Sequence, residues 1–264
     1  MKKLLITGAK GIIFFVGWAV LVGLLPVPDS TNDAVWRFWA ELIPFLCIAG
    51  LSLIFWLIEK RKIEMHLISR LFRNVCIGFG AGALWLGAAV IILAGLGVMR
   101  ITAIDAVPML WLWILSAFIN TIMQELLVRG YLYQMIRYNY NAAAAMVVTT
   151  ALFAFMHGGA FEAGIVSVLN VITMSILMTA VLEYTQSLIA PVIMHFFWNG
   201  VGGIILGGVS LADDYPHLFT TVFTGNTLLS GGEPKMEGSI VVLVINIALI
   251  LLFLLFLKKQ RKAA

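Results

Sequence analysis

Five polar residues lie in otherwise apolar stretches and are of types that can move protons and stabilise charge: Glu125, Arg129, His157, His195 and Asn199. Glu125 and Arg129 are four residues apart, as are His195 and Asn199, so each pair shares one face if its stretch is helical. A glutamate withdrawn from bulk water can act as a general base toward a water molecule. One histidine can hold that water or protonate the leaving amine. A second histidine and an asparagine amide can stabilise the oxyanion of a tetrahedral intermediate.

A bound metal is the alternative chemistry for the same residues. Glu125, His157 and His195 would provide three zinc ligands and leave a fourth position for water. The local H-E-x-x-H spacing of many zinc proteases is absent from the sequence. No serine or cysteine stands next to a histidine as a nucleophile, which favours direct attack by water. From the residues alone, a zinc site and a metal-free site both stay open.

Each residue also has a simpler interpretation when it is taken alone. A single histidine in a membrane helix is commonly a hydrogen-bonded packing residue, and a single asparagine commonly links two helices. One glutamate, two histidines and one asparagine on three separate apolar runs are costly to keep in a membrane unless they converge. Their combination is what indicates a functional site.

The composition identifies the elements that must position these residues. Of 264 residues, 62% are hydrophobic and only 11% are charged, whereas a soluble domain has about 25% charged residues. The mean hydropathy is +1.03. This excludes a soluble enzyme domain and predicts an all-α, polytopic membrane helix bundle, because lipid forces the backbone to satisfy its own hydrogen bonds.

Eight apolar runs predict about eight transmembrane helices. They lie at residues 12–28, 41–58, 76–98, 108–128, 142–157, 163–183, 187–207 and 239–257. The first is interpreted as an uncleaved span, and the fifth is short for a bilayer that needs about 20 residues. The chain divides into three segments: N-terminal spans in 1–107, the four spans with the polar motifs in 108–207, and an outer loop with the last span in 208–264.

The basic residues predict the orientation of these spans. With the N-terminus inside, only Arg37, Arg100 and Lys235 of the 17 Lys and Arg residues fall outside, so the positive-inside rule places both termini in the cytoplasm. The basic excess is then explained by insertion and by anionic lipid, and no nucleic-acid partner is expected. We expect a multi-pass protein of a cell membrane, the bacterial plasma membrane. The basic segment 59–75 is either an amphipathic surface helix or a solvated connector.

Two further patterns concern the way the spans pack. The fourth run carries two adjacent polar rows at spacing four: Ser116, Asn120 and Gln124, beside Thr121, Glu125 and Arg129. A polar stripe in a span faces protein or a water-filled cavity. The third run carries four small residues that predict close helix packing: Gly78, Gly80, Gly82 and Gly87.

Three motifs in the chain resemble a known family. They read Gln124-Glu125-x-x-x-Arg129, Phe153-x-x-x-His157 and His195-x-x-x-Asn199. Their types and order resemble EExxxR, FxxxH and HxxxN in the CPBP family of intramembrane proteases, which includes CAAX prenyl endopeptidases and bacteriocin-immunity proteins.

The resemblance implies a fold and an activity. It implies an eight-helix bundle with a cavity open to the cytoplasmic side, and proteolysis of a peptide or membrane-associated protein tail. The reaction would use glutamate-activated water rather than a bound metal, so the resemblance implies no cofactor, with zinc as the alternative. Membrane lipid is the other expected partner. By position, the catalytic residues would be Glu125, His157, His195 and Asn199, and the supporting residues Gln124 and Arg129.

One departure from the family separates two functions. Gln124 stands where the family has the first glutamate of its pair, the residue given the water-activating role in eukaryotic members. Glutamine cannot act as a base, so either Glu125 takes that role or the chain is a non-catalytic immunity or scaffold protein. A transporter with a Glu and His proton relay is a third hypothesis, but no internal repeat supports it.

The depth of the motifs in the bilayer sets a structural condition. Counting along the spans places Glu125 and His195 in the cytoplasmic half and His157 near the outer end of its run. The fifth span must therefore start late, dip or break if the three residues are to meet.

Overall fold

The computed structural model describes residues 1–209 and 215–263. In this part of the chain, six helices are long and apolar enough to cross a membrane: Lys2–Leu24, Asp33–Ile58, Leu71–Gly95, Leu110–Asn139, Ile165–Thr185 and Ile240–Ala263. Two apolar helices are shorter: Ala142–Met156 and Ile189–Ile205. These eight correspond one to one with the predicted runs. The prediction of an all-α, multi-pass membrane bundle is confirmed, and the cytoplasmic position of the termini stays a prediction.

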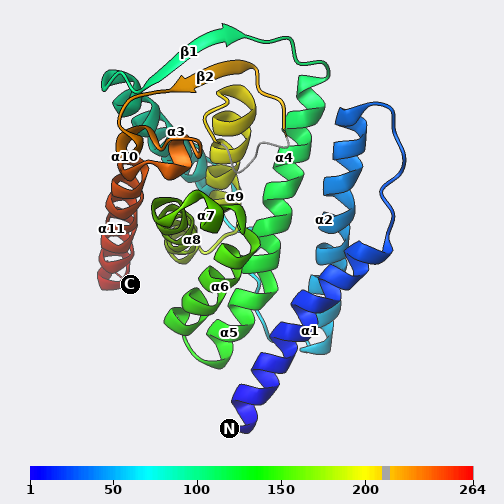
Figure 1. Cartoon of the computed structure of the whole chain (residues 1–264). Coiled ribbons are helices and arrows are strands. Elements are labelled where there is room, and N and C mark those ends of the chain that lie inside the picture. The colour runs from blue at the N-terminus through cyan, green and yellow to red at the C-terminus, as the bar shows by residue number, and fades with distance from the viewer. Residues whose placement is uncertain (210–214, 264) are drawn as a thin grey trace. The chain divides into compact units, whose positions relative to one another are not determined.

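Several of these helices are subdivided, as Figure 1 shows. The helices before the first histidine motif are α1 (Lys2–Leu24), α2 (Asp33–Ile58), α3 (Leu71–Gly95), α4 (Leu110–Glu125), η1 (Leu126–Leu132) and α5 (Tyr133–Asn139). Those from that motif onward are α6 (Ala142–Met156), α7 (Gly159–Ala163), α8 (Ile165–Thr185), α9 (Ile189–Phe196), η2 (Phe197–Ile205), α10 (Thr227–Ser230), η3 (Met236–Gly238) and α11 (Ile240–Ala263). The two strands are β1 (Met99–Ile104) and β2 (Phe219–Phe223).

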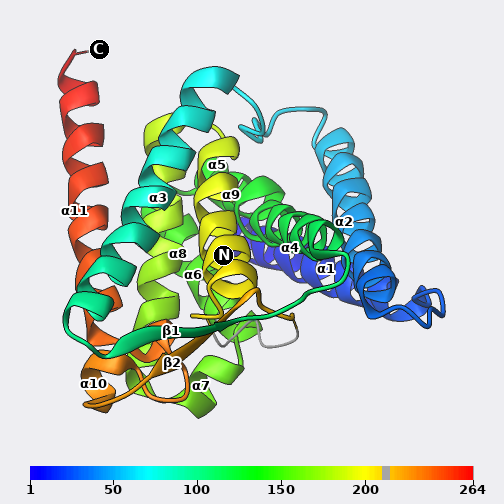
Figure 2. The same cartoon turned by 90° about the horizontal axis from the view of Figure 1, so that it is seen from above.

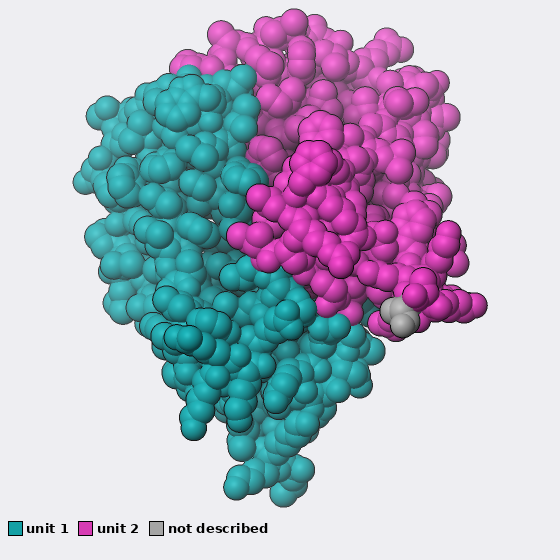
Figure 3. Space-filling model, turned by 180° about the vertical axis from the view of Figure 1, so that it is seen from behind, with its two compact units in different colours: residues 1–67, 109–149 teal, residues 68–108, 150–264 magenta. Residues whose placement is uncertain are grey.

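The chain forms two compact units, coloured separately in Figure 3. Unit 1 comprises residues 1–67 and 109–149, and unit 2 comprises residues 68–108 and 150–264. Each unit joins stretches that are far apart in sequence, because membrane helices associate where their surfaces pack closely and form hydrogen bonds, whatever their order in the chain. The units therefore do not follow the three sequence segments, and each is described by itself.

Unit 1 is held together at the junction of α1, α2 and η1. The rings of Phe14, Phe55 and Tyr131 meet with centroids 5.0 to 5.3 Å apart. Beside them Glu59 accepts hydrogen bonds from Lys10 Nζ at 2.5 Å and from the Tyr131 hydroxyl at 3.2 Å. Since Tyr131 lies within η1, these contacts anchor the chain that follows the glutamate motif.

Unit 2 is built on α3, α8, α9 and α11, which stand side by side in Figure 2. A Cβ atom at Gly78 would lie 2.7 Å from the Ala190 carbonyl oxygen, and one at Gly82 would lie 2.9 Å from the Phe197 ring. Only glycine lets α3 approach this closely, so the packing prediction is confirmed at both positions. It is wrong for two glycines whose Cβ would meet nothing within 4 Å: Gly80 and Gly87.

Hydropathy did not indicate two features of the loops. β1 and β2 pair antiparallel, from Met99 opposite Phe223 to Ile104 opposite Phe219, across one end of the helices of unit 2 (Figure 1). The basic connector forms turns and irregular backbone up to Arg70, and α3 begins at the next residue. An amphipathic surface helix over 59–75 is therefore wrong, because the first part of that segment is not helical.

Candidate active site

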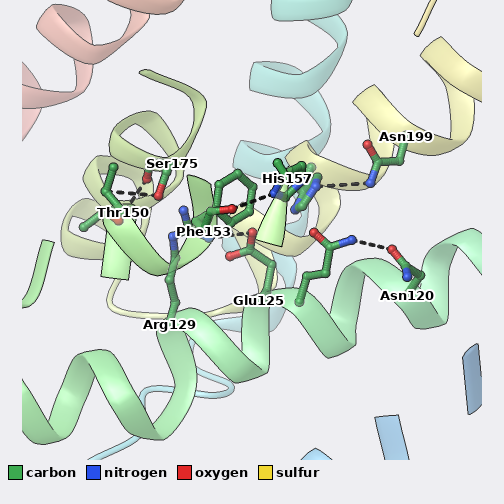
Figure 4. Close-up of polar contacts among 11 residues, drawn as sticks. Asn120, Glu125, Arg129, Thr150, Phe153, His157, Ser175 and Asn199 are labelled. Atoms are coloured by element: carbon green, nitrogen blue, oxygen red, sulfur yellow. Dashed lines mark hydrogen bonds and ion pairs between the residues drawn. The ribbon is translucent and has the colours of Figure 1, made fainter. Parts of the chain in front are cut away.

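Glu125 and Arg129 form a buried ion pair at the point where α4 ends and η1 begins. Arg129 Nη1 lies 2.8 Å from Glu125 Oε1, and neither side chain is exposed (Figure 4). The spacing of four residues therefore places both groups on one face, as predicted. Since neither side chain is exposed, the guanidinium is the counter-charge that compensates the burial of the carboxylate.

The helix widens directly after Glu125. Residues Leu126–Leu132 form the π-helical segment η1, in which Gly130 leaves helical geometry with ψ at −107°. A Cβ atom on Gly130 would lie 2.8 Å from Leu126 Cδ1, so a larger residue there would have to displace the end of that leucine side chain. Short π-helical segments are frequent at functional sites. A second one, η2 (Phe197–Ile205), follows His195 in the same way.

The predicted polar stripe on α4 is present, but its members behave differently. The Ser116 and Thr121 hydroxyls donate to carbonyls of the preceding turn, those of Leu112 and Ala117. These two hydroxyls are thus bound within the helix itself. Asn120 and Gln124 bind each other instead: Gln124 Nε2 donates to Asn120 Oδ1 at 2.5 Å.

The stripe continues to a residue that the sequence analysis missed. Asn120 Nδ2 donates to Glu41 Oε2 at 2.6 Å, and Glu41 Oε1 lies 2.9 Å from Arg37 Nε. Glu41 is only 6% exposed and belongs to α2, which packs along α4. Arg37 and Glu41 have the same spacing of four as Glu125 and Arg129. That charged pair at the start of an apolar run was the available signal.

In unit 2, the first histidine lies in a break of the chain. α6 ends at Met156 and α7 begins at Gly159, so His157 occupies the gap between them. The Thr150 and Ser175 hydroxyls, 3.1 Å apart, tie α6 to α8 (Figure 4).

The protonation pattern of His157 follows from its partner. His157 Nδ1 lies 2.8 Å from the Phe153 carbonyl oxygen. A carbonyl only accepts, so Nδ1 carries a proton, and the neutral ring has its lone pair on Nε2. Phe153 thus orients the second motif through its backbone, which gives the FxxxH spacing a physical meaning.

The second histidine motif is held by a side-chain hydrogen bond. Asn199 Nδ2 lies 3.1 Å from His195 Nε2, so the predicted spacing of four places both residues on one face. The His195 side chain is fully buried. The Phe153 ring contacts both imidazoles, with its centroid 4.2 Å from His157 and 5.9 Å from His195. The two histidine motifs therefore meet at Phe153.

The six predicted residues are divided between the compact units. Unit 1 contains the glutamate motif: Gln124, Glu125 and Arg129. Unit 2 contains both histidine motifs: His157, His195 and Asn199. Within residues 1–209 and 215–263, no group of three or more His, Cys, Asp and Glu side chains is arranged to hold a metal ion. A chelator experiment tests whether the protein depends on a metal.

In a comparison with known proteins, one family model covers both the glutamate motif and the two histidine motifs. Residues 106–201 match the family model described as Rce1-like, type II CAAX prenyl endopeptidase. The matched region contains all three motifs, from Glu125 through His157 to Asn199. No curated protein and no solved structure matches the chain. Over residues 106–201, the chain is thus similar in sequence to a family of type II CAAX prenyl endopeptidases.

Proposed function

We propose that this protein is an intramembrane endopeptidase that hydrolyses a peptide bond in a peptide or membrane-associated protein tail. One observation carries the proposal: a single family match extends over Glu125, His157 and His195. The glutamate and histidine motifs then act in one reaction, although they belong to different compact units. The ordered contacts within each half support this assignment.

Glu125 is the general base of the proposed reaction. Arg129 holds Oε1 at 2.8 Å, which fixes the direction of the carboxylate and keeps it ionised. Oε2 takes a proton from the attacking water, and the water oxygen forms a bond to the substrate carbonyl carbon. Arg129 is a positioning residue in this scheme, since it acts through Glu125.

The two histidine motifs would deliver the proton to the leaving amine and stabilise the oxyanion. The proton that Glu125 has taken must reach the leaving amine as the C–N bond breaks, and His157 Nε2 is the group assigned to deliver it. His195 and Asn199 present N–H donors to the oxyanion of the tetrahedral intermediate, where charge develops. Their mutual contact at 3.1 Å fixes the orientation of both side chains.

A non-catalytic role is the second candidate, and Gln124 is the observation that favours it. A glutamine cannot take a proton from water, so a chain that needs the first glutamate of the family motif would have lost its activity. Such a protein would use the same fold to bind a peptide or another membrane protein, as an immunity or scaffold protein.

Cleavage of defined peptides separates the two candidates. The purified protein in detergent is given a farnesylated CAAX peptide with a fluorophore and quencher on either side of the scissile bond, and the same peptide without the farnesyl group. We expect cleavage by the wild type, none by Glu125→Gln, and no loss on adding a chelator. In parallel, new protein termini are compared in cells that express either form. If neither peptide is cut and the two cells have the same termini, the non-catalytic role replaces the endopeptidase.

A further inference from the structure

Glu41 connects α2 to the glutamate motif through a chain of side chains. Its carboxylate lies 2.9 Å from Arg37 on one oxygen and accepts from Asn120 on the other at 2.6 Å. Asn120 in turn accepts from Gln124 at 2.5 Å. All four residues lie in unit 1, and Gln124 directly precedes Glu125. Figure 4 shows the last link, between Asn120 and the neighbouring amide on α4.

The direction of this chain of hydrogen bonds is fixed by chemistry. An ionised carboxylate only accepts, so Asn120 must turn its NH₂ group toward Glu41. Its Oδ1 then faces Gln124, which must donate a hydrogen bond from its own NH₂ group. A glutamine amide can be turned by 180° to exchange the positions of its oxygen and its NH₂ group, but here the charge of Glu41 selects one of the two orientations.

This orientation leaves one acceptor without a partner. Gln124 Oε1 is buried and has no hydrogen bond to any residue within 1–209 and 215–263. Buried polar atoms in proteins are almost always hydrogen-bonded, so each exception needs an explanation. An oxygen held in place beside the proposed general base in sequence, with its lone pairs available, is suited to accept from a ligand.

We infer that Glu41, acting through Asn120, fixes Gln124 as a positioning residue whose Oε1 accepts a hydrogen bond from an N–H or O–H donor of the reaction. The inference rests on the proposed endopeptidase function. The donor is either the attacking water or a backbone N–H of the substrate peptide. Glutamine is then required at position 124. The NH₂ group of Asn120 is already bound to Glu41, so Asn120 can offer only Oδ1 to position 124, and a glutamate there has no N–H to donate to it.

A polarity swap tests the direction of the chain. Gln124→Glu alone should lower the unfolding temperature, since Asn120 would face a carboxylate on both sides. In the double variant Glu41→Gln with Gln124→Glu, the chain can reverse: Asn120 donates to Glu at position 124 and accepts from Gln at position 41. Glu41→Gln also removes the charge that pairs with Arg37, so the double variant is compared with both single variants. Its loss of unfolding temperature should be clearly smaller than the two single losses added together. If the two losses simply add, the inferred direction is wrong.

Kinetics test the acceptor role. Gln124→Met keeps the length of the side chain and removes both polar ends, so kcat/KM on the peptide that the wild type cuts should fall about tenfold or more. A lower kcat at constant KM identifies the water as the donor, and a higher KM at constant kcat identifies the substrate N–H. The swapped double variant keeps an oxygen at this position and should retain activity. Unchanged kcat and KM in Gln124→Met would overturn the role.

Two controls separate this inference from other effects. Glu59→Gln is the matched variant, directly after the end of α2. It also alters a partly buried ion pair, with Lys10, but glutamine keeps an oxygen that can accept from the Tyr131 hydroxyl. No contact with Asn120 is found among the described residues, so kcat and KM should stay unchanged. Loss of cleavage in Glu125→Gln establishes the proposed function independently. If the wild type cuts no substrate, the acceptor role falls with the proposed function, whereas the unfolding temperatures still decide the direction of the chain.

Discussion

Glu125 and Arg129 form an ion pair at 2.8 Å in which neither side chain is exposed. Moving two charges out of water is costly, and their attraction offsets that cost only while both are present. The pair is therefore weak evidence for stability in itself and strong evidence that the two residues depend on each other. The spacing of four residues places the guanidinium where it compensates the burial of the carboxylate.

Removing the arginine should destabilise the protein more than removing the pair. Arg129→Met takes away the cation that neutralises Glu125, and breaking a buried pair in this way costs about 3–5 kcal/mol. The double variant Glu125→Gln with Arg129→Met removes both charges and should recover most of that loss. Thermal unfolding in detergent measures both. A double variant no more stable than Arg129→Met would show that the two charges do not depend on each other.

His157 should separate stability from activity. Asparagine at this position can still donate to the Phe153 carbonyl oxygen, which His157 Nδ1 contacts at 2.8 Å, but it has no counterpart of Nε2. We expect His157→Asn to unfold near the wild-type temperature and to lose about a hundredfold or more of peptide cleavage, the contribution of a general acid or base. His157→Ala should lose both properties. Wild-type cleavage by His157→Asn would remove this histidine from the mechanism.

The tautomer of His195 should depend on Asn199. The Asn199 amide donates to Nε2 at 3.1 Å, which places the ring proton of neutral His195 on Nδ1. Aspartate at position 199 only accepts and should draw a proton onto Nε2. Nitrogen NMR of the four labelled histidines, with His195→Ala to assign the signals, reports the change. An identical His195 spectrum in Asn199→Asp would contradict the contact.

Two neighbouring glycines on α3 form a matched pair for the packing of the histidine helix. Alanine at Gly78 would place its Cβ 2.7 Å from the Ala190 carbonyl oxygen, whereas alanine at Gly80 would meet nothing within 4 Å. Overpacking costs about 1–3 kcal/mol, so Gly78→Ala should lower the unfolding temperature. It should also lower cleavage, because α9 carries His195. Gly80→Ala should match or exceed wild-type stability, and equal behaviour of the two variants would refute close packing at Gly78.

Much of this arrangement could be predicted from sequence because it depends on local geometry. The eight apolar runs became eight helices, since a bilayer permits few other structures. The pairs Glu125 with Arg129 and His195 with Asn199 are bound as expected, since a spacing of four fixes the face of a helix. That the fifth span starts late, dips or breaks so that the three motifs meet stays a prediction.

The remaining features depend on which helices become neighbours. The contact between Glu41 and Asn120 exists because α2 packs along α4, and no periodicity in either run specifies that choice. The wide turns η1 and η2 follow from how backbone hydrogen bonds shift by one residue, which hydropathy does not record. The Phe153 ring could be assigned to a motif, but its contact with His195 comes from another helix.

The shortness of the two histidine helices has a consequence for the lipid around them. α6 has 15 residues and would extend about 22 Å, against a hydrocarbon layer of about 30 Å. The helix Ile189–Ile205, with 17 residues, extends about 25 Å. A bilayer meets such a mismatch by thinning locally, which brings headgroups and their hydration closer to the histidines. Acyl chain length thereby becomes a determinant of how readily water reaches any chemistry that these residues perform.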